Sequence, residues 1–351
     1  MIAKGDVLLL VSKDMGGANV GIPLAQEAIK AGYKIAVIAE GLAAGKYEDA
    51  GFRLYFKGTT DFSEESFSLD AMGVVERLKP AVVVTTLSVP INLEQSFGFA
   101  ANNFRIPLVF LEDFWGVHLR SQAKPDLVLS IDQVGADLVY RKYGSLTRTK
   151  IVGNYTVNRI RELKIPEETR EVVKRLRNMF DKVFVFAAGG AHVSEQIQLL
   201  KKCLRQTSDG VLIPRFHPKS VNLTAPSGKT FGEEWRELLK EFGDRVAYLE
   251  SQATEPLVAL ADVTFSDFST LLTTALVFKH QAVSIATPMV RQTMMNEVGF
   301  TTHPLVGVGL VKEVGEPRDL SEFVKEPDLL SIHEYLCPYD PREALRAIEA
   351  L

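Results

Sequence analysis

The chain has 351 residues, which is more than one ordinary hydrophobic core organises and suits two domains. Hydrophobic residues make up 46% of the chain and charged residues 24%, a composition typical of water-soluble globular proteins. The formal net charge of −4 excludes a global basic field, so we expect no nucleic acid partner. Cys203 and Cys337 lie too far apart in sequence for a metal-ligand spacing or a disulfide framework, which favours a reducing, cytoplasmic setting.

The first residues, MIAKGDVLLLVSKDMGG, contain too short an apolar run for a signal peptide or a membrane span. Asp6–Val11 is instead typical of a strand buried on both faces, and a helical pattern follows the glycine pair and ends at Gly32. A strand, a glycine turn and a helix in this order predict a parallel sheet. Further strands are expected at 34–39, 53–56, 81–85, 107–111, 126–131 and 150–152, with helices at 18–31, 69–78, 91–104 and 134–142.

The pattern starts again after a polar helical segment at 166–179. Strands are expected at 182–187, 211–213, 246–249, 262–265 and 282–286, with helices at 193–204, 255–260, 269–278 and 341–351. We predict two doubly wound α/β domains, at 1–160 and 161–335, and a C-terminal helix within 336–351 that packs back on the first domain. Ligands of such sheets bind at the carboxyl ends of the strands, and the cleft between two facing domains is the expected site.

Paired glycines follow the first strand of each predicted domain. Gly16 and Gly17 precede Asn19 in the first domain, and Gly189 and Gly190 hold the matching position in the second. Glycines let a ligand approach the backbone and leave helix N–H groups free for a pyrophosphate, or they form a tight turn only. The first turn, which we assign to the acceptor side, lacks the GxGxxG spacing, so a dinucleotide fingerprint is not supported.

Cationic side chains gather in the segment IPRFHPKS. Arg215, His217 and Lys219 follow an apolar strand, and Pro218 fixes the backbone after the histidine. These three side chains are suited to holding a phosphate, although a solvated basic loop is the alternative.

Hydroxyl groups gather in the segment FSDFST, between a strand and an apolar helix. Ser266, Asp267, Ser269 and Thr270 form either an anion site at a helix start or, for Asp267 or Ser269, an ordinary helix cap.

Two adjacent acids, Glu112 and Asp113, end a buried strand in LEDFWGVH. In an extended chain they point to opposite sides, so only one can face a ligand and act as the general base. Asp14 is a further candidate for that role. Trp115 either stacks on a sugar ring or packs in the core. His280, His303 and His333 show no metal-ligand spacing, and we predict no metal site.

Together these motifs resemble glycosyltransferases of the GT-B fold, which have two Rossmann-like domains facing across a cleft. The segment EPLVALADVTFSDFSTLLTTALVFKHQAVSIATP is similar to their donor-binding region. The chain order of the acidic pair, His217-Pro218 and Ser269-Thr270 is similar to that of CDP-glycerol glycerophosphotransferases and bacterial sialyltransferases. The resemblance implies that His217 holds the donor phosphate, that Ser269 and Thr270 add hydroxyl contacts, and that Asp113 or Glu112 is the base.

The sequence departs from that pattern twice. Phe114 and Trp115 separate the acidic pair from Gly116, whereas glycine follows the pair directly in those enzymes. The helix STLLTTAL lacks the glutamate with which many nucleotide-sugar enzymes hold the ribose, so the nucleotide stays open between UDP and CMP or CDP.

We therefore expect a metal-independent glycosyltransferase that needs no cofactor and acts in polysaccharide or glycolipid synthesis. Its partners are a nucleotide sugar and a carbohydrate or lipid-linked acceptor. An apolar and basic surface at residues 97–105 would allow peripheral contact at the inner face of the membrane, although a buried amphipathic helix accounts for it equally. The alternatives are an isomerase similar to UDP-N-acetylglucosamine 2-epimerase, a CDP-glycerol-type transferase, and a nucleotide-binding relative without activity.

Overall fold

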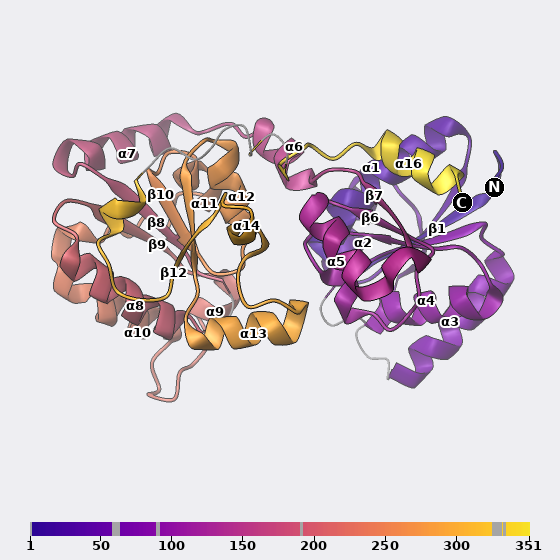
Figure 1. The fold of residues 1–351 in the computed structure, drawn as a ribbon, viewed down its shortest axis with the longest axis horizontal. Helices are drawn as coiled ribbons and strands as arrows, with labels where there is room; N and C mark the ends of the chain where they lie inside the picture. Colours follow the sequence, from indigo (N-terminus) through magenta and orange to yellow (C-terminus); the bar gives the residue numbers. More distant parts are fainter. Residues whose placement is uncertain (1, 58–63, 89–91, 190–191, 325–331, 333–334) are drawn as a thin grey trace. The chain divides into compact units, whose positions relative to one another are not determined.

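The computed structural model describes residues 2–57, 64–88, 92–189, 192–324, 332 and 335–351. The chain divides into two compact units (Figure 1). Unit 1 comprises residues 1–155 and 337–351, and unit 2 comprises residues 156–336. The sequence analysis placed these boundaries near residues 160 and 335.

Unit 1 is built on a seven-stranded parallel sheet with the order β3-β2-β1-β4-β5-β6-β7. Its strands are β1 (Val7–Ser12), β2 (Lys34–Ala39), β3 (Leu54–Lys57), β4 (Val82–Thr86), β5 (Leu108–Leu111), β6 (Leu127–Ser130) and β7 (Arg148–Ile151). Its helices are α1 (Met15–Ala31), α2 (Gly41–Asp49), α3 (Glu64–Leu78), α4 (Asn92–Phe104), η1 (Val117–Arg120), α5 (Gln133–Tyr143), η2 (Gly144–Leu146) and α16 (Pro341–Glu349).

Unit 2 is built on a five-stranded parallel sheet with the order β12-β11-β10-β8-β9. Its strands are β8 (Val183–Ala187), β9 (Val211–Arg215), β10 (Val263–Ser266), β11 (Gln281–Ile285) and β12 (Lys312–Val314). Its helices are α6 (Tyr155–Arg161, which begins at the last residue of unit 1), α7 (Glu167–Met179), α8 (Val193–Gln206), α9 (Pro218–Val221), α10 (Phe231–Leu239), η3 (Lys240–Arg245), α11 (Thr254–Val258), α12 (Thr270–Val277), α13 (Pro288–Val298), α14 (Pro304–Gly307) and η4 (Leu320–Phe323).

The central strands of each sheet are buried on both faces, as their continuous apolar runs predict, whereas the edge strand β7 is exposed. In β1, Leu9 and Val11 belong to a core cluster with residues of α3 and α4, while Leu8 and Leu10 belong to one with residues of α1 and α16. The C-terminal helix α16 lies beside α1, although the two helices stand near opposite ends of the chain (Figure 1). Helices on both faces of a parallel sheet make each unit a doubly wound α/β domain, which confirms the predicted fold class.

The order of the strands locates a switch point in each sheet. After β1 the chain adds β2 and β3 on one side and then returns to place β4 on the other. After β8 it adds β9 on one side and β10 on the other. The crevice beyond the carboxyl ends of two such strands is where doubly wound domains bind ligands. The relevant residues therefore follow β1 and β4 in unit 1, and β8 and β10 in unit 2.

One predicted strand, at 246–249, is wrong. Val246 makes a single bridge to Leu212 of β9, and no strand continues from it. The Leu249 carbonyl accepts a hydrogen bond from the Arg215 guanidinium at the end of β9, so a side chain takes the place of a ladder of backbone hydrogen bonds there. The sequence analysis also left several short elements unassigned, namely α2, α6, α10, α13, α14 and β12.

Candidate functional site

In unit 2 an aspartate packs on the glycine that follows β8. A Cβ atom placed on Gly189 would lie 2.2 Å from both carboxylate oxygens of Asp267, which follows β10. Glycine is needed here so that these two strand ends can approach each other. We expected the close approach to be made by a ligand; in the structure Asp267 makes it. Gly190 lies outside the described residues.

The Asp267 carboxyl is nearly enclosed, with 7% of the residue exposed. Its Oδ2 atom accepts a hydrogen bond from Nε2 of Gln196 on α8, at 3.1 Å. Its Oδ1 atom is buried and has no hydrogen-bond partner among the described residues. Burial raises the pKa of this carboxyl. Gln196 was not predicted from the sequence, although its position one turn into the helix after the glycine pair was a usable signal.

The three hydroxyls of FSDFST have separate roles. The Ser266 hydroxyl is buried and donates to the Ala187 carbonyl of β8, so the structure does not offer it to a ligand. Ser269 is the N-cap of α12 and accepts from the Leu271 N–H at 3.2 Å, which is the capping alternative. Thr270, the first residue of α12, is half-buried beside that cap.

Arg215 is a structural residue, and the expectation that its guanidinium is free for a phosphate is wrong. Its nitrogens donate to the carbonyls of Leu249 and Gln252 and to the Thr254 hydroxyl, at 2.5, 2.7 and 3.2 Å. These bonds tie the loop before α11 to the end of β9. Burial lowers the pKa of this guanidinium.

His217 stands after β9, at the carboxyl edge of the same sheet, and its side chain is half-buried. Its carbonyl accepts the N–H groups of Ser220 and Val221 and so starts α9. The side chains of Pro218 and Lys219 lie outside the described part of the structure, so their predicted roles stay predictions. The candidate ligand groups of unit 2 are therefore His217, Thr270, the start of α8 and the Asp267 carboxyl.

Unit 1 repeats the contact between a glycine and an aspartate. A Cβ atom on Gly16 would lie 1.8 Å from Oδ2 of Asp113, which follows β5. A Cβ atom on Gly17 would lie 2.2 Å from the Thr86 hydroxyl at the end of β4. Asn19 lies half-buried one turn into α1. Both glycines of the first turn thus leave room for side chains from the ends of β5 and β4.

Asp14 caps α1 by accepting from the Gly17 N–H at 2.8 Å, which explains why the helix starts at Met15, three residues before the predicted start. A capping carboxylate is committed to the helix, so Asp14 is a weak candidate for the general base. Its charge instead acts on its neighbours, because burial and the nearby Asp14 carboxylate together raise the pKa of Asp113 to about 7.

The two residues of the acidic pair differ in burial, because successive side chains of an extended chain point to opposite sides. Glu112 is fully buried; its Oε1 atom lies 2.6 Å from Nδ1 of His118, and its Oε2 atom accepts from the Ser130 hydroxyl at 2.7 Å. Glu112 therefore cannot reach a ligand in this structure, and its assignment as base is wrong. Asp113 is half-buried and has a pKa suited to proton transfer near neutral pH, so it is the candidate base.

Trp115 belongs to the core. Its ring is completely buried, and Nε1 donates to Oδ2 of Asp132 at 2.7 Å. Of the two roles considered for Trp115, packing in the core is confirmed and stacking on a sugar is wrong, because the residue is completely buried.

Glu94 on α4 is a buried acid that sequence reasoning missed. It is completely buried, its Oε1 atom accepts from the Ser88 hydroxyl at 2.6 Å, and burial raises its pKa to about 7. The available signal was an acid on the same helix face as Phe97 and Ala101.

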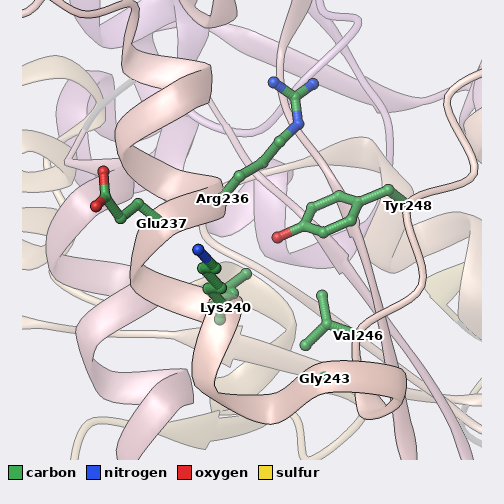
Figure 2. A pocket seen from close by; sticks show the side chains of 7 residues that line it. Arg236, Glu237, Lys240, Gly243, Val246 and Tyr248 are labelled. Carbon is green, nitrogen blue, oxygen red and sulfur yellow. The ribbon is translucent and has the colours of Figure 1, made fainter.

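A separate groove of about 600 Å³ lies in unit 2 between α10, η3 and the segment after it. Figure 2 shows Arg236 and Tyr248 side by side on its wall, with the guanidinium carbon 5.8 Å from the ring centre. Arg236 pairs with Glu250, and Glu237 on the same wall pairs with Lys229. None of the residues predicted to form the site lines this groove.

The described residues contain no group of three or more histidine, cysteine, aspartate or glutamate side chains placed to hold a metal ion. Within the same residues, no helix has the length and apolar character needed to cross a membrane.

No protein-family model and no curated protein sequence matches the chain. Solved structures match it over almost its whole length. The UDP co-structure of S. aureus MnaA is similar at a TM-score of 0.64 and 12% identity, over 98% of this chain and 95% of that one. Anabaena Alr3699/HepE in complex with UDP and glucose gives 0.61 and 12%, over 99% and 100%. The UDP-GlcNAc 2-epimerase of Methanocaldococcus jannaschii, in complex with UDP-GlcNAc and UDP, gives 0.58 and 12%, over 98% and 99%.

At these identities the likeness establishes the fold. The chain has the GT-B fold, with two Rossmann-like domains, and the resemblance found in the sequence is confirmed at that level.

Proposed function

We propose that this chain binds a nucleotide-activated sugar through unit 2 and transfers the sugar to an acceptor hydroxyl. The observation that carries the proposal is the carboxyl edge of the unit 2 sheet. There α8 and α12 begin beside the β8/β10 switch point, and His217 follows the adjacent strand β9. Helix starts and an imidazole N–H are groups that bind phosphate. Three structural neighbours that contain UDP, two of them with a sugar or UDP-GlcNAc, support a nucleotide sugar as the ligand.

Asp113 supplies the base in this proposal. Its carboxylate removes the proton of the acceptor hydroxyl while that oxygen bonds to the sugar carbon. The bond from the sugar to the phosphate breaks, and the nucleotide leaves with the electron pair. A half-buried carboxyl with a pKa of about 7 is matched to proton transfer at neutral pH.

Binding is tested first, with UDP, CDP, CMP and GDP in calorimetric titrations of the full chain. We expect one of these nucleotides to bind, and we expect His217→Ala to weaken that binding about tenfold or more through the loss of a charge-assisted hydrogen bond. His280→Ala is the matched control, because His280 follows the C-terminal end of α12, and its Nε2 atom lies 3.0 Å from the Ala259 carbonyl. If none of the four nucleotides binds, the donor site is wrong.

Transfer is tested by nucleotide release from sugar donors in the presence of acceptor sugars and lipid-linked sugars. For Asp113→Asn we expect nearly normal donor binding. We expect the transfer rate to fall by about 10²-fold or more, which is the usual contribution of a general base. Asp49→Asn, an exposed acid at the end of α2, should keep the wild-type rate. Transfer that is equally fast in both variants would eliminate Asp113 as the base.

An epimerase is the second candidate, because UDP-GlcNAc 2-epimerases are among the structural neighbours. An epimerase needs no acceptor. Incubation of the protein with UDP-N-acetylglucosamine alone, followed by NMR of the sugar, separates the two functions: a new sugar favours the epimerase, and an unchanged sugar favours the transferase.

A further inference from the structure

The unpartnered oxygen of Asp267 lies at the switch point of unit 2. Its carboxyl is packed on Gly189, and Gln196 fixes one of its oxygens from α8. The other oxygen, Oδ1, is buried without a hydrogen-bond partner among the described residues. A buried carboxylate oxygen without a donor is costly, whereas a protonated oxygen at the same place is a donor that needs an acceptor.

The groups that face this carboxyl from the packed elements are neutral. They are Gln196 of α8, Ser266 of β10, and the backbone at Gly189, Asp267 and Phe268. Ser284 of β11 donates to the Asp267 carbonyl. The titratable side chains at the start of α8 are held by α13: Glu195 accepts from the Thr287 hydroxyl, and Nε2 of His192 lies 2.8 Å from the Thr293 hydroxyl.

We propose that Asp267 controls the donor site by its protonation state. The neutral carboxyl donates Oδ1–H to an oxygen of a phosphate bound at the start of α8, and the ionised carboxylate repels that phosphate. The inference rests on the proposed nucleotide site and adds its regulation: the site takes up one proton from solvent when it binds an anionic phosphate.

The environment of Asp267 favours the protonated form, because burial is the largest influence on this carboxyl and raises its pKa. A raised pKa means that the proton is bound at low pH and lost as the pH rises through the folded-state value. Nucleotide affinity should therefore fall with rising pH, in proportion to the protonated fraction, which amounts to about tenfold per pH unit above that pKa.

The test is calorimetric titration of UDP into the full chain between pH 6 and pH 8.5. In wild type we expect the dissociation constant to rise with pH more steeply than in Asp267→Asn, which offers a neutral amide donor at every pH. Ionisation of the UDP phosphate affects both proteins alike, so the difference between the two profiles isolates Asp267. Asp262→Asn, at the other end of β10 and bonded to Arg177, is the matched control and should follow wild type.

If the dissociation constants of wild type and Asp267→Asn rise equally with pH, Asp267 does not control the donor site by its protonation state. That result would leave the nucleotide site itself intact. No binding of UDP by either protein at any pH would instead count against the nucleotide site itself.

Proton uptake gives a second measurement that needs no substitution at Asp267. Titration of wild type at pH 8 in buffers of different ionisation enthalpy should show uptake of up to about one proton on binding UDP. The uptake should persist in His217→Ala at saturating UDP. Its absence in wild type, or its loss in His217→Ala, would assign the proton elsewhere and contradict the proposal.

Discussion

The same residue contact occurs at both switch points. Gly16 receives the Asp113 carboxyl in unit 1, and Gly189 receives the Asp267 carboxyl in unit 2. Asp267 follows β10, which pairs with β8, whereas Asp113 follows β5, which β4 separates from β1. Burial raises the pKa of both carboxyls. A glycine at the end of the first strand therefore brings a proton-carrying group to the place where a doubly wound domain binds its ligand.

At the residue scale we expect Gly16→Ala to be destabilising by about 1–3 kcal/mol, because the new methyl group would lie 1.8 Å from Oδ2 of Asp113 and must displace it. Gly45→Ala on α2 is the matched control. Nothing lies within 4 Å of a Cβ atom there, and alanine should stabilise that helix by about 0.5–1 kcal/mol. Urea unfolding of both variants measures the two effects.

The cause is tested by combining Gly16→Ala with Asp113→Ala. Removal of the carboxyl should relieve the conflict, so the double variant should lose at least about 1 kcal/mol less than the sum of the single variants. Additive losses would show that Asp113 is not what the methyl group meets.

Sequence reasoning found the glycines and the acids but not their pairing. The pairing depends on the strand order, which places the ends of β1 and β5 on either side of β4, and no local pattern records that order. The hydrogen-bond partners of Trp115 and Glu112 could not be predicted for a similar reason. Both are polar groups whose partners, Asp132 and His118, become neighbours only after folding.

At the element scale, the sequence predicted helices and strands correctly where a repeating pattern of apolar residues continued over many positions. They failed at short elements whose backbone is fixed by distant side chains, such as the loop that Arg215 holds in place of a strand at 246–249. The helix α10 could have been predicted, because the capping box of Thr230 and Glu233 at its start is a local sequence pattern.

We expect Arg215→Met to act on stability rather than on ligand binding. It removes three part-buried hydrogen bonds of a charged donor to the loop before α11 and to Thr254, at a cost of about 2–4 kcal/mol. Arg245→Met is the matched control, since Arg245 also donates to two backbone carbonyls, those of Gly210 and Thr207. Urea unfolding and UDP titration of both variants make the comparison. A tenfold loss of UDP affinity confined to folded Arg215→Met would restore Arg215 as a phosphate ligand.

At the scale of the whole molecule, the two units differ in how the chain completes them. Unit 2 is one continuous segment, whereas unit 1 needs residues 337–351 from the far end of the chain. The returning segment buries Tyr339, Leu345 and Ile348 in the core cluster that also holds Leu8 and Leu24. Its start is joined to the end of the first segment, because the Asn154 N–H donates to the Cys337 carbonyl at 2.8 Å.

We therefore expect residues 156–336 to fold alone, residues 1–155 to fail, and residues 1–155 joined to 337–351 by a short Gly-Ser linker to fold. Loss of three buried apolar side chains costs about 5–9 kcal/mol, which is as large as the stability of a typical domain. The linker can be short because Asn154 and Cys337 are already hydrogen-bonded. Circular dichroism and thermal melting of the three chains provide the measurement.

The joined chain carrying Leu345→Ser and Ile348→Ser is the control for the packing of α16, and it should melt like residues 1–155. A cooperative transition in residues 1–155 that matches the joined chain would show that unit 1 does not depend on its C-terminal helix.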